Sequence, residues 1–185
     1  MSPVEQPLDK LLVAVHDRTA YVHVQGRGSF KVSTGLKQFG MAAIDSRCQR
    51  IILDMTECIG MDSTFMGVLA GLAFHIRKMA GGDIVLINLS PRTRGLLGTL
   101  GLDQIIKPFM TGDMPEEFKR DAELVDKMFA LDLGETTDRS TAETMLEAHE
   151  TLIELAPDNL PKFKDVLTFL RQDLKKMDAN KQGSP

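Results

Sequence analysis

Residues 50–80 read RIILDMTECIGMDSTFMGVLAGLAFHIRKMA, and this stretch decides the fold. It opens with a short apolar run, 51–53, which ends at Asp54. After the pair Asp62-Ser63, apolar side chains recur at the spacing of an amphipathic helix: Phe65, Met66, Leu69, Leu72, Ala73, Ile76 and Met79. The stretch therefore predicts a buried strand, a tight connection and a helix, with the Ser63 hydroxyl at the helix start.

The segments on either side predict a sheet that alternates with helices. Upstream, two short segments joined by a turn predict a β-hairpin. Downstream, Gly81-Gly82 ends the central helix and Ser90-Pro91 begins another. The expected strands cover 11–15, 21–26, 50–55, 83–89 and 105–109. Three helices are expected: the first is capped by Ser33 or Thr34, the second starts at the pair 62–63, and the third is capped by Ser90. This order predicts an α/β fold in which helices pack on a mixed β-sheet.

From Met114 onward the pattern becomes helical. We therefore predict a domain over 1–112 and a helical extension over 113–185, with about three helices. The first helix is expected to start at Pro115 and to present one apolar face: Phe118, Ala122, Val125 and Phe129. A linker over 132–139 follows, and Ser140 with Glu143 has the pattern of a capping box at the next helix start.

Two apolar stripes follow that cap, separated by a break over 157–161. Their members are Met145, Leu146, His149, Leu152 and Ile153, and then Phe163, Val166, Leu167, Leu170, Leu174 and Met177. Two such helices can pack as a hairpin. Because short amphipathic helices are marginal when isolated in water, we expect a homodimer or a partner-binding hairpin at this end of the chain.

Composition excludes several classes of function. A hydrophobic content of 43% over 185 residues is enough for a core, and the net charge of −4 without a dense basic run argues against nucleic acid as a partner. The apolar runs are too short to span a membrane, and the N-terminus lacks the apolar core of a signal peptide, so we expect a cytoplasmic protein. Cys48 and Cys58 lack metal-ligand spacing. We expect them to be reduced and structural, with no metal and no cofactor.

The pair Asp62-Ser63 has two interpretations. Asp and Ser are both preferred at helix starts, where their oxygens accept hydrogen bonds from free N–H groups. The alternative is that Ser63 is phosphorylated. A helix N-terminus can hold a phosphate locally, while the added charge of about −1.5 to −2 changes what can dock there.

The arrangement resembles the STAS domain (sulphate transporter and anti-sigma factor antagonist), in particular the stand-alone anti-sigma factor antagonists. In that family an apolar strand ends in Asp, and a short apolar loop then leads to an Asp-Ser pair at a helix start. Here 51–54 match the strand, 59–61 match the loop, and Asp62-Ser63 match the pair. The resemblance covers roughly 11–109 and implies a mixed sheet with helices mainly on one side, followed here by a C-terminal helical extension.

By this resemblance the phosphorylated residue is Ser63, with Thr64 as the second choice. The resemblance implies that the unphosphorylated protein binds an anti-sigma factor, often a serine kinase of the histidine-kinase-like ATPase fold. That kinase would phosphorylate the serine, and a serine/threonine phosphatase would restore it. The chain departs from the family pattern at Thr64 and Phe65, where a second Ser and a Gly are common. The expected partner-binding residues are Asp62, Ser63, Thr64, Phe65, Met66, Arg92 and Arg94.

Two further interpretations remain open. Within the family, the chain could be a scaffold in a signalling complex without direct control of a sigma factor. Outside it, 51–54 and the sequence Lys107-Pro108 are similar to a two-component receiver phosphorylated on Asp54. A receiver needs an acidic pair after its first strand to hold Mg²⁺, and here a second strand follows that first strand directly.

We do not expect an enzyme. The histidines at 16, 23, 75 and 149 are scattered along the sequence, and no spacing of Ser, His and Asp indicates a nucleophile elbow. Asp54 and Asp62 could lie close together, but a turn and a helix cap explain them more simply. The ATP chemistry of the proposed switch belongs to the partner kinase.

Overall fold

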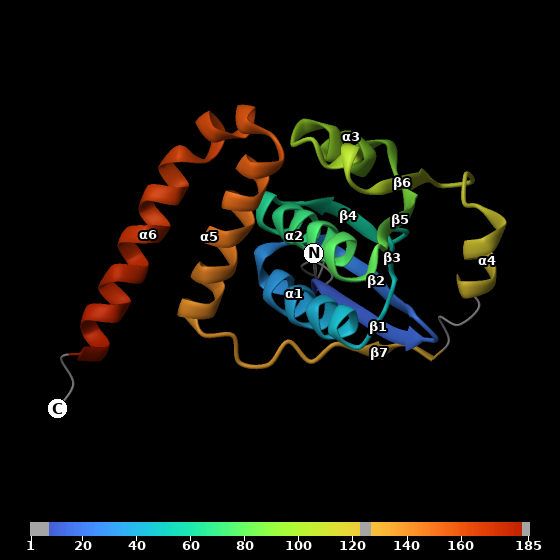
Figure 1. Cartoon of the computed structure of the whole chain (residues 1–185), viewed down its shortest axis with the longest axis horizontal. Coiled ribbons are helices and arrows are strands. Elements are labelled where there is room, and N and C mark those ends of the chain that lie inside the picture. The colour runs from blue at the N-terminus through green and yellow to red at the C-terminus, as the bar shows by residue number, and fades with distance from the viewer. Residues whose placement is uncertain (1–7, 123–126, 183–185) are drawn as a thin grey trace, which may run out of the picture.

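A seven-stranded mixed sheet forms the centre of the computed structural model, which describes residues 8–122 and 127–182 (Figure 1). Its strands are β1 (Lys10–His16), β2 (Thr19–Gly28), β3 (Arg50–Asp54), β4 (Cys58–Met61), β5 (Asp83–Leu89), β6 (Lys107–Met110) and β7 (Phe129–Ala130). The strand order is β6-β5-β3-β2-β1-β7, and β4 pairs with the end of β2.

The predicted hairpin and the predicted α/β class are both confirmed. β1 runs antiparallel to β2, whereas β2, β3, β5 and β6 are parallel neighbours. The register places Asp54 beside His23 of β2 and Ile87 of β5. The polar residue that ends the central strand thus lies between two other strands, near the point where the chain turns toward Asp62.

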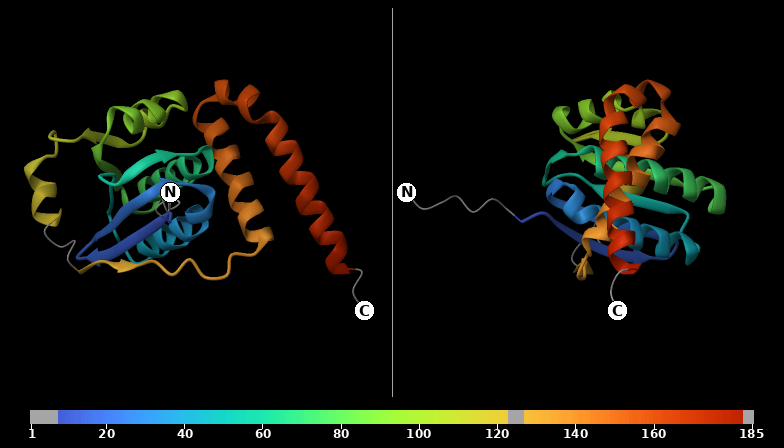
Figure 2. Two further views of the ribbon diagram at one scale, coloured as in Figure 1. Left: turned by 180° about the vertical axis from the view of Figure 1, so that it is seen from behind. Right: turned by 90° about the vertical axis from the view of Figure 1, so that its left-hand side faces the viewer.

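Helices cover mainly one face of the sheet, as the resemblance implied. They are α1 (Phe30–Asp45), α2 (Ser63–Ala80), α3 (Pro91–Thr99), α4 (Glu116–Ala122), α5 (Asp138–Leu155) and α6 (Leu160–Gln182), with short 3₁₀ turns η1 (Leu102–Gln104) and η3 (Pro157–Asn159). α1 and α2 pack on the sheet, α5 packs on both of them, and α6 packs on α5 at the outside of the molecule (Figures 1 and 2).

The core has two parts because the central strand is apolar on both faces. Ile51 and Leu53 face the large core under α1 and α2. Ile52 faces the opposite side, where a smaller cluster includes Phe118 of α4. The guanidinium of Arg50 lies 5.1 Å from the centre of the Phe118 ring. The second face of the sheet is therefore partly covered by α4.

Several local predictions in the second half of the chain are wrong. Phe129 is not in a helix: it pairs with Val13 in the two-residue strand β7, because the free edge of β1 offers backbone partners. Val125, on the same predicted helical face, lies outside the described residues. The N-cap of α5 is Thr137, whose side chain accepts the Ser140 N–H, so Ser140 lies inside the helix.

The first helix also starts earlier than expected. α1 begins after Ser29, and Ser33 and Thr34 are buried inside it. Their hydroxyls find other partners: that of Ser33 donates to the Ser29 carbonyl, and that of Thr34 donates to Thr144 of α5. Within the described residues, none of the helices combines the length and the apolar character needed to cross a membrane.

The phenyl ring of Phe65 lies directly against Gly28 at the end of β2. A methyl group added at Gly28 would lie 2.7 Å from that ring, so Gly28→Ala should lower the free energy of unfolding by about 1–3 kcal/mol. Phe65→Leu in the same chain should recover part of this loss. Urea unfolding of the double-mutant cycle measures the coupling. Gly95→Ala, which adds a methyl into open space on α3, is the control. Equal costs of Gly28→Ala with and without Phe65 would contradict the contact.

Candidate functional site

The carboxylate of Asp62 joins the starts of two helices. Its Oδ1 accepts the Phe65 N–H at 2.9 Å, which makes Asp62 the N-cap of α2. Its Oδ2 accepts the Phe30 N–H at 2.7 Å, at the first residue of α1. Both helices thus direct free N–H groups to one carboxylate, as expected for a charge that stabilises helix N-termini.

Ser63 is the first residue of α2, and it is half-buried. Its Oγ lies 2.9 Å from Nε2 of His149 on α5. The other ring nitrogen, Nδ1, donates to the Met145 carbonyl at 2.6 Å, because a carbonyl can only accept. Burial lowers the pKa of His149, so the ring is neutral and Nε2 carries no proton. Ser63 is therefore the donor of this hydrogen bond.

The other predicted partner-binding residues differ from Ser63 in their exposure to solvent and in their contacts. Thr64, Phe65 and Met66 are buried, with 3%, 0% and 4% of their surfaces exposed. Arg94 is half-buried and lies 3.7 Å from Asp103 of η1, measured from Nη1 to Oδ2. Arg92 is exposed on α3. In this conformation, Asp62 and Ser63 are the members of the α2 start that keep some exposure.

The residue that sequence analysis missed at this site is His149. The apolar stripe of α5 includes this position, which shows that it faces a packed surface, but the stripe does not say which surface. The ring is 3% exposed and lies 4.8 Å from the Phe163 ring of α6, centre to centre. The double role of Asp62 was also missed, since nothing in the sequence links Phe30 to the start of α2.

A polar cluster holds the turn that leads to the site. His23 of β2 lies between two carboxylates: its Nδ1 is 3.3 Å from Asp54 Oδ2 and its Nε2 is 2.5 Å from Glu57 Oε2. Asp54 Oδ1 also accepts from the backbone and side chain of Thr56 and from Asn88 of β5. These contacts fasten the segment between β3 and β4 to two neighbouring strands.

The charges in this cluster stabilise one another. The close contact with the Asp54 carboxylate raises the pKa of His23, and the Glu57 carboxylate adds to this effect. Burial opposes it, and the resulting pKa is about 9. Burial alone would raise the pKa of Asp54, but the ion pair with His23 and the hydrogen bonds from Thr56 and Asn88 hold this pKa well below its usual range. His23 is therefore protonated at neutral pH, between two ionised carboxylates.

The topology argues against the receiver interpretation. A receiver has the doubly wound parallel order 2-1-3-4-5, whereas this chain begins with an antiparallel hairpin. Asp54 is held by His23, Thr56 and Asn88. Lys107 pairs with Asp83 at the start of β5, while Asp54 lies beside Ile87 farther along that strand.

Comparison with known proteins agrees with this geometry. A sequence model of the STAS domain matches residues 10–113. The structure of the anti-sigma factor antagonist SpoIIAA in its unphosphorylated form is similar, with a TM-score of 0.51 and 21% sequence identity, and the alignment covers 61% of this chain and 95% of that chain. A putative anti-sigma factor antagonist from Thermotoga maritima has a TM-score of 0.50 and 17% identity, covering 60% of this chain and 92% of its own. At these identities the likeness concerns the fold. No curated protein matches the sequence.

The His23 cluster predicts a pH dependence of stability. Because the pKa of His23 is raised from 6.5 to about 9 on folding, its contribution is fully present below pH 6.5 and is lost as the pH rises through 9. His23→Gln should remove this loss, so the free energy of unfolding should fall less steeply between these pH values. Urea unfolding across the range tests it, with His16→Gln at an exposed position as the control. An unchanged slope in His23→Gln would contradict the ion pairs.

Proposed function

Because the chain belongs to the STAS domain family, we propose that it is a regulatory switch of the anti-sigma factor antagonist kind, controlled by phosphorylation of Ser63. The observation that carries the proposal is the position of Ser63 as the first residue of α2, next to the capping carboxylate of Asp62. In this proposal the protein is not an enzyme, and it acts in the cytoplasm by binding or releasing a partner.

The physical basis of the switch is a local change of charge. A phosphate on Ser63 would lie near free N–H groups at the start of α2, whose partial positive charge favours an anion. It would also add about −1.5 to −2 charges beside Asp62. The sheet and α2 can tolerate such a group at a helix end, whereas a partner surface shaped for a neutral hydroxyl cannot.

The proposed partners follow from the family. An anti-sigma factor, or a serine kinase of the histidine-kinase-like ATPase fold, would bind the surface around the α2 start, and a serine/threonine phosphatase would reverse the modification. We place Asp62, Ser63 and the exposed Arg92 in this surface, with Thr64, Phe65, Met66 and Arg94 contributing where partner binding exposes them. Thr64 is the second candidate for phosphorylation, but only 3% of it is exposed.

Residues 1–112 would form the switch domain and 113–185 its extension. A homodimer through the C-terminal helices stays a prediction. The apolar stripes that suggested it are already buried within the chain at Leu152, Phe163, Leu167 and Leu170. Because α5 packs on α1 and α2, we also propose that the extension acts on its own domain.

The proposal is tested with each anti-sigma kinase of the stated fold that the source genome encodes. One of them should phosphorylate the wild-type chain on Ser63 and leave Ser63→Ala unmodified. Ser63→Ala should keep its affinity for that kinase, and Ser63→Asp should bind about tenfold more weakly or worse, because it adds a charge at the interface. Phosphosite mapping and titration calorimetry give the two readouts.

Thr64→Ala is the matched control for the modification and should still be phosphorylated. Equal affinity of Ser63→Asp and the wild type for the cognate kinase would contradict the charge switch. Phosphate found on Thr64 with Ser63 unmodified would move the switch to the second residue.

A further inference from the structure

The C-terminal hairpin of α5 and α6 lies on the proposed phosphorylation site. We propose that docking of this hairpin and a phosphate on Ser63 exclude each other, so that the docked hairpin shields Ser63 and a phosphorylated Ser63 releases the hairpin. The inference rests on the proposed function of Ser63, and it adds a regulatory element supplied by the same chain. It is carried by four features of the contact between α2 and α5.

The first feature is the direction of the hydrogen bond between Ser63 and His149. The ring offers a lone pair at Nε2, because its proton is on Nδ1 and is donated to Met145. A hydroxyl can donate to that lone pair, but the phosphate dianion, which is the main form at neutral pH, can only accept. Phosphorylation therefore replaces an attractive contact with one in which two acceptors face each other.

The second feature is the closeness of the two helices one turn further along. A methyl group added at Gly67 would lie 2.4 Å from the Ala148 carbonyl oxygen, so the backbone of α5 lies directly over this glycine. Four residues on, at Gly71, the nearest atom to an added methyl would be 4.0 Å away, on Thr151. The contact between the helices is therefore tightest in the first turns of α2, near Ser63.

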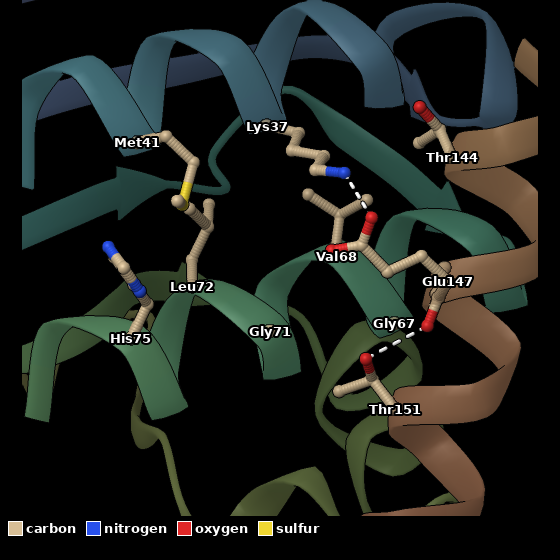
Figure 3. Close-up of a pocket in the computed structure, with 11 residues that line it drawn as sticks. Lys37, Met41, Gly67, Val68, Gly71, Leu72, His75, Thr144, Glu147 and Thr151 are labelled. Atoms are coloured by element: carbon tan, nitrogen blue, oxygen red, sulfur yellow. Dashed lines mark hydrogen bonds and ion pairs between the residues drawn. The ribbon is translucent and has the colours of Figure 1, made fainter. Parts of the chain in front are cut away.

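The third feature is the attachment of α5 to α1 by polar contacts. The Thr34 hydroxyl donates to Thr144, and Lys37 forms an ion pair with Glu147. Figure 3 shows this ion pair above Gly67 and Gly71, with His75 at the far end of the groove. These contacts hold the hairpin across both helices of the face, but exposed ion pairs contribute little to stability.

The fourth feature is a cavity in the same seam. It has a volume of about 110 Å³, and Lys37, Gly71, His75, Glu147 and Thr151 are among the residues that line it. The cavity extends from Gly67 and Ala148 to His75, so the seam is incompletely packed beside the close contact at Gly67 as well as beyond Gly71. Incomplete packing lowers the free energy needed to separate two surfaces, which suits a segment that detaches.

A phosphate on Ser63 is unfavourable in either direction that it can take while α5 stays docked. If it points toward α5, it must fit between helices already in close contact and face the lone pair of Nε2. If it points toward solvent or toward the free N–H groups at the α2 start, the buried ring of His149 loses its donor, and Nε2 is left as an unsatisfied buried acceptor. Detachment of the hairpin relieves both situations. By thermodynamic linkage, a docked hairpin must then disfavour the phosphate to the same degree.

The experiment measures hydrogen exchange of α5 amides in the full chain, with no kinase present. Ser63→Asp presents only acceptors to Nε2, whereas Ser63→Asn has the same size and can still donate. We expect exchange in α5 to be about tenfold faster in Ser63→Asp than in the wild type, and Ser63→Asn to stay near the wild type. A phosphoserine introduced at this position during translation should act like Asp, with a larger effect.

Amides of β3 and β5 provide the reference for intact folding, and their exchange should not change. A second pair of variants acts from the other side of the seam. Gly67→Ala should speed exchange in α5, because the added methyl collides with the α5 backbone, while Gly71→Ala should not. Both substitutions raise the helix propensity of α2 by a similar amount, so the difference between them reports on docking.

The inference is overturned if Gly67→Ala speeds exchange in α5 and Ser63→Asp does not. That result would mean that the hairpin can open but that His149 takes up a proton and retains the acidic side chain. Equal acceleration by Ser63→Asp and Ser63→Asn would also overturn it, since size and not charge would be responsible. Failure to find a kinase for Ser63 would contradict the proposed function and leave the exchange result unaffected.

Discussion

The Asp62 carboxylate is the constraint on which the site depends, because it satisfies backbone donors at the starts of both α1 and α2. Buried or half-buried helix ends need such partners. Since both helices converge on one side chain, their first turns are held close together. The hydroxyl of Ser63, the next residue, consequently lies where both helices and α5 meet.

The sheet fixes Asp62 through the segment before it. β4 pairs with the end of β2, and the Asp62 N–H donates to the Gly28 carbonyl at 2.9 Å. The turn before β4 is held by Glu57 and Asp54 around a protonated His23. The protonated ring of His23 is partly buried, and an unpaired charge there would be unfavourable. The carboxylates of Asp54 and Glu57 stabilise it by pairing with it. The position of Ser63 is thus set by strand pairing on one side and by charge pairing on the other.

Most of the first half of the fold could be predicted from the sequence, because the helices and strands there have clear periodicity. β3, α2, the initial hairpin and the Ser90 cap of α3 are where their patterns indicated. The connection over 59–61 is predicted to be a loop, but it belongs to the strand β4, which pairs with β2. Phe129 could not be placed, since a two-residue strand has no period and its pairing with Val13 depends on a free sheet edge. The contact between Ser63 and His149 spans 86 positions, and no local pattern reports a pairing over that separation. The apolar stripe on α5 predicted that this face would be buried, but not what would cover it.

The central claim is that Ser63 donates to an unprotonated nitrogen of His149, and that this donor–acceptor order makes the site sensitive to negative charge. The most direct test is the imidazole ¹⁵N spectrum of the wild-type protein at neutral pH, with His149→Gln used to assign the ring. We predict a neutral ring with its proton on Nδ1 and with Nε2 accepting a hydrogen bond. A proton found on Nε2, or a fully protonated ring, would contradict the account. Ser63 would then accept a hydrogen bond from Nε2, and a phosphate on Ser63 could accept the same bond.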